Sequence, residues 1–306
     1  MLASATMKMT RREALSLCVV PLLAQSRPKI AITMDDVAWQ LIPEHHRAEA
    51  EGRLLKHLRR TRAFLFPVGR NVDNEHGSQI LTNWSAAGHL IGNHTYNHQS
   101  LSGNVTPAEF EQGILRADEI LRKYTGFRKW FRFPALKEGR TPELRDRFRA
   151  FLALHGYLNG AVTIDASDWY YNQRLLARIE ANQRFDVTLY RQPYLNHIWN
   201  RAQFYDQLSR DVLGRGVAHT LLIHYNLLNS LFLGDLLTMF RSRGWEIINA
   251  DDALSDSVFA RQPNTAPAGE SLIWALAKET GRFEDRLRYP GENDTYEKPI
   301  LDQLRL

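Results

Sequence analysis

Cysteine is almost absent from this chain of 306 residues, since Cys18 is the only one. It lies in a segment that we expect to be removed, so the mature chain would have neither a disulfide nor thiolate chemistry. Long runs of one charge, internal repeats and low-complexity segments are lacking as well. Arginines recur at helical spacing among acids, and the formal net charge is only +5. This pattern predicts solvated helix faces and gives no support for nucleic-acid binding.

The first 26 residues have the pattern of an export signal. Arg11 and Arg12 precede an apolar run over residues 14–24, and a small-x-small cleavage site ends at Ser26. The run is too short to span a bilayer. We therefore expect a signal peptide over 1–26, of the twin-arginine type, and a bacterial protein exported to the periplasm or the extracellular space. The alternative is an amphipathic first helix of the fold.

Beyond residue 28, short apolar runs alternate with amphipathic segments. The expected strands are 29–34, 62–68, 89–94, 129–134, 160–165, 186–190, 219–224 and 245–250. The expected helices lie near 45–60, 78–87, 107–123, 141–155, 173–184, 200–213 and 231–243. This alternation predicts βαβ units and a parallel sheet, and seven or eight units favour closure into a barrel. We expect one α/β domain over 27–260, and an appendage over 261–306 made of a linker (261–269), a short helix and a polar tail.

Two neighbouring acids, Asp35 and Asp36, follow the first apolar strand. Neighbouring residues of a strand point to opposite faces, so the chain would have to turn here for both to serve one site. Adjacent like charges also repel each other unless a cation or a shared task compensates. Taken alone, the pair has a simpler alternative, an acidic turn after a buried strand.

Other expected strands are also followed by polar residues. Catalytic residues of parallel α/β folds collect at the carboxyl ends of strands. At these ends the sequence has His94 and His98, Arg132, Asp165, Asp168 with Trp169, and His224. Taken one at a time, these residues could equally be a polar loop, a strand-end ion pair, a surface acid beside a core indole and a buried histidine.

The two histidines are four residues apart, so one helical turn would place both imidazoles on one side. Two histidines and one aspartate form the three-ligand set with an open position that hydrolytic zinc sites use. One acid of the Asp35–Asp36 pair could then bind the metal while the other accepts a proton from water. The residue types therefore predict a metal-dependent hydrolytic site.

The ordered segments TMDD, HTYNH, RFP, DASDW and LIH resemble the five motifs of the polysaccharide deacetylases. This family is also known as the chitin deacetylase or NodB-homology domain of carbohydrate esterase family 4. The resemblance covers roughly residues 29–255. It implies a distorted (β/α)7 barrel that removes N-acetyl groups from a glycan with the help of a divalent metal, usually Zn2+.

The resemblance also implies roles for the residues of the first half of the set. Asp35 would be the general base that takes a proton from the attacking water. Asp36, His94 and His98 would bind the metal ion. Arg132 would keep Asp35 ionised and oriented through a charge-assisted hydrogen bond.

The second half of the set would handle the leaving group and the substrate. By resemblance, His224 would be the general acid that protonates the departing amine, and Asp168 would orient it and raise its pKa. Trp169 would form a wall of the sugar groove. The backbone N–H just after Pro134, that of Ala135, would hold the oxyanion together with the metal.

Two positions depart from the family pattern. Val37 stands where the family usually has glycine, so the loop after the paired acids must differ, and Ala135 stands where an aromatic residue usually follows the proline. An O-acetyl esterase, or an amidohydrolase acting on a non-sugar amide, could use the same site. A non-catalytic glycan-binding protein is a third alternative, against which the intact polar residues argue. The sequence leaves the glycan, the native metal and the oligomeric state open.

Overall fold

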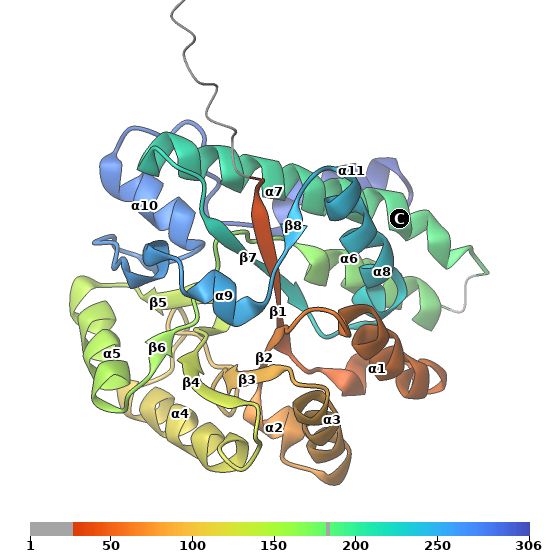
Figure 1. Cartoon of the computed structure of the whole chain (residues 1–306), viewed down its shortest axis with the longest axis horizontal. Coiled ribbons are helices and arrows are strands. Elements are labelled where there is room, and N and C mark those ends of the chain that lie inside the picture. Colours follow the sequence, from red (N-terminus) through yellow and green to blue (C-terminus); the bar gives the residue numbers. More distant parts are fainter. Residues whose placement is uncertain (1–26, 182–183) are drawn as a thin grey trace, which may run out of the picture.

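A parallel sheet lies at the centre of the protein and helices surround it, as a computed structural model of residues 27–181 and 184–306 shows (Figure 1). Its strands are β1 (Lys29–Asp36), β2 (Phe64–Pro67), β3 (Leu90–Asn93), β4 (Phe127–Phe131), β6 (Leu158–Asn159), β7 (Ala218–His224) and β8 (Glu246–Ile247). Their order is β6-β4-β3-β2-β1-β7, and β8 pairs with the first residues of β1.

The segment that follows β6 brings the two edges of the sheet together. β6 pairs with β4 at one edge, and Ile164 then forms a parallel bridge with Leu221 of β7 at the other. The N–H of Leu222 donates to the carbonyl of Ile164 at 3.0 Å. The sheet therefore curls into an incompletely closed barrel, which confirms the predicted α/β fold class.

Seven helices correspond to those that the sequence predicts. They are α1 (Glu44–Leu58), α3 (Glu75–Ala86), α4 (Pro107–Leu121), α5 (Pro142–Leu154), α6 (Asp168–Glu180), α7 (Arg191–Leu213) and α8 (Leu227–Ser242). α7 begins nearer the amino end than predicted, because Pro193 falls in its first turn, where proline is tolerated. The shorter helices are α2 (Gly69–Val72), α9 (Ala250–Leu254), α10 (Leu272–Thr280) and α11 (Asp294–Gln303).

Three of the predicted strands need correction. Residues 186–190 are not a strand: Val187–Tyr190 form a 3-10 helix, whose start is capped by the Asp186 side chain accepting from the N–H of Thr188. Residues 160–165 contribute only the bridge at Ile164, because the chain here crosses between the edges of the barrel. The strand predicted at 245–250 is shortened to β8, since α9 begins at Ala250.

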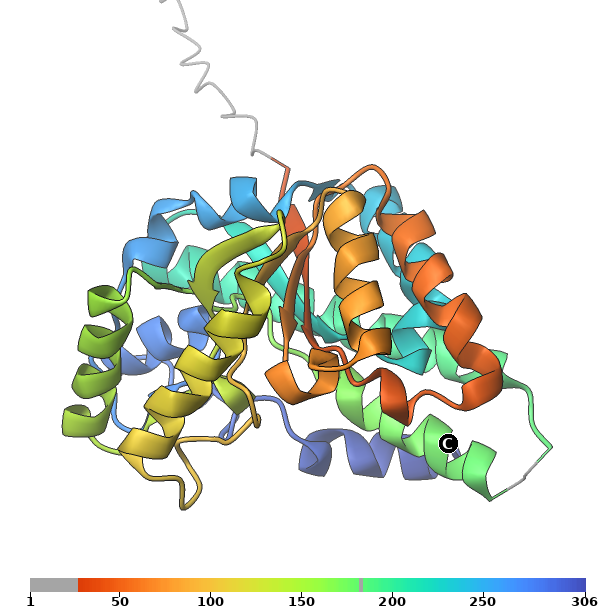
Figure 2. The same ribbon diagram turned by 90° about the horizontal axis from the view of Figure 1, so that it is seen from below.

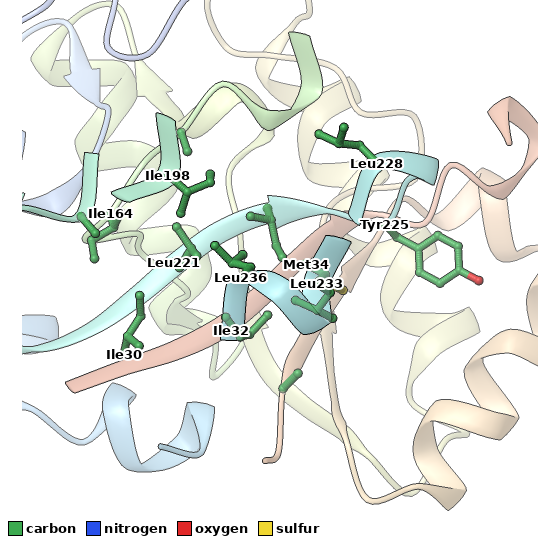
Figure 3. Close-up of a cluster of buried hydrophobic side chains, with 14 of the residues drawn as sticks. Ile30, Ile32, Met34, Ile164, Ile198, Leu221, Tyr225, Leu228, Leu233 and Leu236 are labelled. Carbon is green, nitrogen blue, oxygen red and sulfur yellow. The ribbon is translucent and has the colours of Figure 1, made fainter. Parts of the chain in front are cut away.

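The main core lies between the sheet and the helices α7 and α8. Ile30, Ile32 and Met34 on one face of β1 pack with side chains of β7, α7 and α8 (Figure 3). The strand alternation turns Thr33, and Asp35 just after Met34, to the other face. Both are buried, so this face of β1 carries polar groups into the interior of the barrel.

The segment after residue 260 packs closely on the rest of the chain. Within the predicted linker, β9 (Ala268–Gly269) pairs antiparallel with β5 (Lys137–Gly139). Ile273 and Trp274 of α10 and Leu301 of α11 belong to the same buried cluster as β1. α11 lies against α6 (Figure 2). The division of the chain into a domain and an appendage stays a prediction. Among the described residues no helix is long and apolar enough to cross a bilayer.

Candidate active site

The chain turns at the end of β1, and this turn brings both acids to one place. Asp36 and Val37 have φ angles of 75° and 50°, in the left-handed region. His94 Nε2 is 3.7 Å from Asp35 Oδ2 and 3.4 Å from Asp36 Oδ1, so the two neighbouring carboxylates face the same imidazole. A left-handed conformation costs an L-residue about 1–2 kcal/mol, and a β-branched residue such as Val37 is unusual there. The turn that the sequence requires is therefore present without the expected glycine.

Asp36, His94 and His98 form a cluster that could hold a metal ion, with their ligand atoms within 4.8 Å of one another. Asp36 Oδ1 is 3.3 Å from His98 Nε2, and it is buried without a hydrogen-bond partner in the part of the chain described. His94 Nδ1 lies 2.7 Å from the carbonyl of Arg132, to which it can donate. In the neutral tautomer that donates from Nδ1, Nε2 is unprotonated, as a metal ligand must be. These donors suit a small divalent cation such as Zn2+.

The two histidines approach each other through a loop and not through the predicted helical turn. Thr95 and His98 have φ angles of 61° and 57°, which no right-handed helix contains. The loop is held by Asn93 Oδ1, which accepts from the N–H of Thr95 at 2.9 Å, and by Thr95 Oγ1, which accepts from the N–H of His98 at 3.0 Å. The ring centroids of the histidines are 4.8 Å apart. The predicted proximity is correct, but its structural reason was wrong.

Two of the three ligands, Asp36 and His98, are held in the protonation states that metal binding needs. Burial raises the pKa of Asp36, but the neighbouring histidines outweigh it and lower this pKa well below its usual range. Burial lowers the pKa of His98 to about 4, against the attraction of Asp36. At neutral pH Asp36 is therefore an anion and His98 is neutral.

Arg132 and Asp35 form a buried ion pair beside this cluster, exposed by 1% and 2%. Arg132 Nη1 lies 3.1 and 3.2 Å from the two carboxylate oxygens, and Nη2 donates to Thr33 Oγ1 at 3.2 Å. Arg132 Nε donates to the carbonyl of Gly160. The guanidinium is thus fixed on three sides, and it holds the Asp35 carboxylate in one orientation.

Asp168 and His224 form a second polar pair, and Asp168 is fully buried. His224 Nδ1 donates to Asp168 Oδ1 at 2.8 Å, and Asp168 Oδ2 accepts from the N–H of His224 at 2.9 Å. The side-chain amides of Asn226 and Asn229 donate to Asp168 Oδ2 at 3.2 and 2.7 Å. This arrangement leaves Nε2 as the ring atom of His224 that can donate a proton elsewhere.

Asp168 keeps His224 protonated. Burial lowers the pKa of His224, but Asp168, followed by Asp36 and Asp35, reverses the effect and raises this pKa to about 10. Because folding raises this pKa, the protonated ring stabilises the folded state. This contribution to the free energy of unfolding is fully present below the ordinary histidine pKa of about 6.5 and is lost as the pH rises through 10. Metal-free wild type should therefore lose its stability advantage over His224→Gln between about pH 6.5 and 10. Urea unfolding of both proteins at several pH values measures this, and a constant difference would contradict it.

A cavity of about 410 Å³ joins the two polar pairs and the metal cluster. Its lining includes Trp169 and Ala135 as the sequence predicts, and Ala135 has a φ of 50°. Pro134 is buried and is not part of the lining. Asp165 also lines the cavity, and burial, followed by Glu292 and Glu270, raises its pKa to about 8.

Sequence reasoning missed several residues of this site. The segment after residue 260 supplies part of the cavity lining, namely Glu270, Pro290, Glu292 and Asn293. None of them lies in a motif or at the end of an expected strand, so no sequence pattern indicated them. Asn226 and Asn229 had one signal, because they lie two and five residues after His224, where β7 ends and α8 begins.

Comparison with known proteins identifies a family whose sequence pattern matches part of this chain. Residues 23–157 match the family described as polysaccharide deacetylase. This part of the chain has the sequence pattern of the polysaccharide deacetylase family. The matched range contains Asp35, Asp36, the two histidines and Arg132, whereas Asp168 and His224 lie beyond it. The search of curated proteins found no match.

Solved structures of carbohydrate esterase family 4 have a fold similar to that of this chain. Wild-type BA3943, a pseudoenzyme of carbohydrate esterase family 4 from Bacillus anthracis, matches with 17% identity over 75% of this chain and 66% of that chain, with a TM-score of 0.50. A mutant of BA3943 with restored enzymatic activity matches with 17% identity over 75% and 68%, with a TM-score of 0.51. A family 4 carbohydrate esterase from Streptomyces lividans in complex with acetate matches with 20% identity over 72% and 91%, with a TM-score of 0.46. At these identities the likeness extends to the fold alone.

Proposed function

We propose that this protein is a metal-dependent hydrolase that removes N-acetyl groups from an N-acetylated glycan. The observation that carries the proposal is the grouping of three sets of residues around one cavity. These sets are the Asp36–His94–His98 cluster, the carboxylate of Asp35 held by Arg132, and the imidazole of His224 held by Asp168. Together they offer a metal site, a base and an acid, which are the groups that hydrolysis of an amide needs.

The proposed reaction divides the work among these residues. A divalent ion, which we propose to be Zn2+, would polarise the acetyl carbonyl and make water more acidic when held by Asp36, His94 and His98. Asp35 accepts a proton from the water whose oxygen adds to the carbonyl carbon. The backbone N–H of Ala135 donates to the oxygen that becomes negative.

His224 completes the reaction. An amine is a poor leaving group unless its nitrogen receives a proton, and His224 carries that proton at neutral pH because of its raised pKa. It donates from Nε2 to the nitrogen as the carbon–nitrogen bond breaks, which gives acetate and a free amino sugar. Trp169 forms one wall of the cavity beside the site and would contact the sugar ring.

A substitution of His224 tests this assignment and separates it from its nearest alternative. His224→Ala should lower kcat/KM for N-acetylglucosamine oligomers about 10²–10⁴-fold, because the amine then leaves without its proton. The loss should be much smaller for 4-nitrophenyl acetate, whose phenolate leaves unprotonated. Acetate release and nitrophenolate absorbance measure the two reactions, and His155→Ala, at a histidine outside the cavity, is the control.

Three outcomes would redirect the proposal. Equal losses on both substrates would contradict the role of His224 as the acid. Activity of the wild type on O-acetylated glycans but not on N-acetylated ones would favour an O-acetyl esterase with the same site. Bound zinc without hydrolysis of any acetylated sugar would point to a non-sugar amide or to a glycan-binding protein without activity.

We also propose that the protein acts outside the cytoplasm, where the acetylated glycans of a cell envelope are found. It rests on the export signal predicted over residues 1–26, which lies outside the described residues.

A further inference from the structure

A chain of hydrogen bonds links α11 to the start of α6, next to Asp168. Glu297 Oε2 lies 3.1 Å from His197 Nδ1, and His197 Nε2 accepts from the N–H of Ser167 at 2.9 Å. Ser167 directly precedes Asp168, which holds His224. We propose that His197 and Glu297 are positioning residues that hold Asp168, and through it His224, in the orientation that proton donation requires. This inference rests on the proposed function.

His197 lies against the start of α6, where the N-cap residue Ser167 makes few other hydrogen bonds. Ser167 is the N-cap residue of α6, yet its side chain makes no capping hydrogen bond, and its Oγ has no partner in the part of the chain described. Its N–H is bonded to the His197 ring instead. The ring therefore fixes the point at which α6 begins, and with it the direction of the Asp168 side chain at the first position of the helix.

Glu297 fixes the tautomer of His197. Because the ring must accept at Nε2 from Ser167, its proton lies on Nδ1, where Glu297 can accept it. Burial raises the pKa of Glu297, but His197 and Arg288 lower it below its usual value, so the carboxylate is ionised. A carboxylate that orients an imidazole in this way is the arrangement that metal-site histidines use with their outer partners.

The Asp168 carboxylate makes the next link. Asp168 lies on α6, whereas the groups that donate to it belong to β7 and α8: the N–H and Nδ1 of His224, Asn226 and Asn229. A small displacement of the start of α6 would lengthen these bonds and move the His224 ring, because the carboxylate holds that ring from one side. The segment after residue 260 thereby contributes to the acid half of the site, as well as to the cavity wall.

His197→Phe is the first test, because it keeps a ring but removes the acceptor for the Ser167 N–H. We expect kcat for N-acetylglucosamine oligomers to fall about 10–100-fold, the range found for outer partners of a site, with KM unchanged. Hydrolysis of 4-nitrophenyl acetate should change much less. His197→Gln should restore much of the rate, since its amide oxygen can accept in the place of Nε2.

A matched control separates positioning from general loosening of α11. Asp302 of α11 forms an ion pair with Arg174 of α6 at 2.8 Å. These two residues lie further along α11 and α6 than Glu297 and Asp168 do, and so away from the His197 ring. Asp302→Asn should leave both activities unchanged. If His197→Phe does not fold, as judged by its circular dichroism and melting, Glu297→Gln takes its place, because it keeps the side-chain volume while weakening the bond to Nδ1–H.

A spectroscopic measurement tests the inference without turnover. The Nδ1 proton of His224, bonded to Asp168, should give a far-downfield proton NMR signal that is absent from His224→Gln. It should shift or broaden in His197→Phe and return in His197→Gln. An unmoved signal, or equal losses on amide and ester, would overturn the inference. If the wild type hydrolyses neither substrate, the proposed function fails, and the NMR signal alone then decides whether His197 positions Asp168.

Discussion

Asp36→Ala should lower the zinc bound by the protein from about one equivalent per chain to background, and acetate release should be lost with it. Asp36 Oδ1 lies between the two imidazoles, 3.4 Å from His94 Nε2 and 3.3 Å from His98 Nε2. Without this carboxylate, two neutral nitrogen ligands remain, which is fewer than a hydrolytic zinc site uses. Elemental analysis after dialysis against a chelator and reloading with zinc measures the change.

The backbone at Asp36 requires a second variant, since its φ of 75° suits aspartate and asparagine better than alanine. Asp36→Asn preserves that tolerance while removing the charge, so it should fold like the wild type and bind zinc far more weakly. Asp73→Asn is the matched control. Asp73 accepts from the hydroxyl of Tyr96, which lies in the loop between the two histidines, but Asp73 does not line the cavity. Full zinc content in Asp36→Ala would refute Asp36 as a metal ligand. Loss of zinc in Asp73→Asn would mean that removing any nearby negative charge weakens zinc binding, so that the result for Asp36 would not identify a ligand.

Asp35→Asn should keep the zinc but lower kcat about 10²–10⁴-fold, the usual contribution of a general base. The amide of asparagine cannot accept the proton of the attacking water, although its oxygen can still accept a hydrogen bond from Arg132. Initial rates of acetate release from N-acetylglucosamine oligomers, together with zinc analysis, separate the loss of the base from loss of the metal.

Stability must be followed in the same variant, because Arg132 is left buried without its counter-ion. Removing one partner of a buried ion pair destabilises a protein by about 3–5 kcal/mol. Asp206→Asn is a suitable control: Asp206 is a partly buried carboxylate that pairs with Arg210 and His219 outside the cavity. A variant Asp35→Asn with near wild-type turnover would place the base elsewhere, and Asp165 would be the next carboxyl group to test.

The sequence predicted those features whose signal is local. β1 and β7 are buried strands with continuous apolar runs, and both end in polar residues that meet in the structure. α4 and α5 begin close to the predicted positions, because at each start a threonine, Thr106 or Thr141, caps the helix and a proline follows it. The predicted site residues, apart from Arg132, Pro134 and Asp168, line one cavity, because parallel strands bring their carboxyl ends to one edge.

The predictions that were wrong concern features that depend on contacts between distant segments. Residues 160–165 were predicted as a strand from a short apolar run. Their path is set by closure of the barrel against β7, which such a run does not indicate. The proximity of His94 and His98 depends on left-handed residues held by Asn93 and Thr95, so spacing alone suggested a helix. The contribution of Glu297 could not be predicted from the sequence, since α11 meets His197 of α7 only through the tertiary packing of segments about 100 residues apart.

The central place of β1 also bears on how the protein is synthesised. β1 pairs along most of its length with β7, from Lys29 opposite Ala218 to Asp35 opposite His224. At a translation rate of about 5–20 residues per second, β7 leaves the ribosome roughly 10–40 s after β1. During this time an apolar strand has an open edge, which is a template for aggregation. The nascent chain therefore carries this unpaired edge until residues near 224 have emerged, and we expect fragments that end before β7 to aggregate more readily than the whole chain.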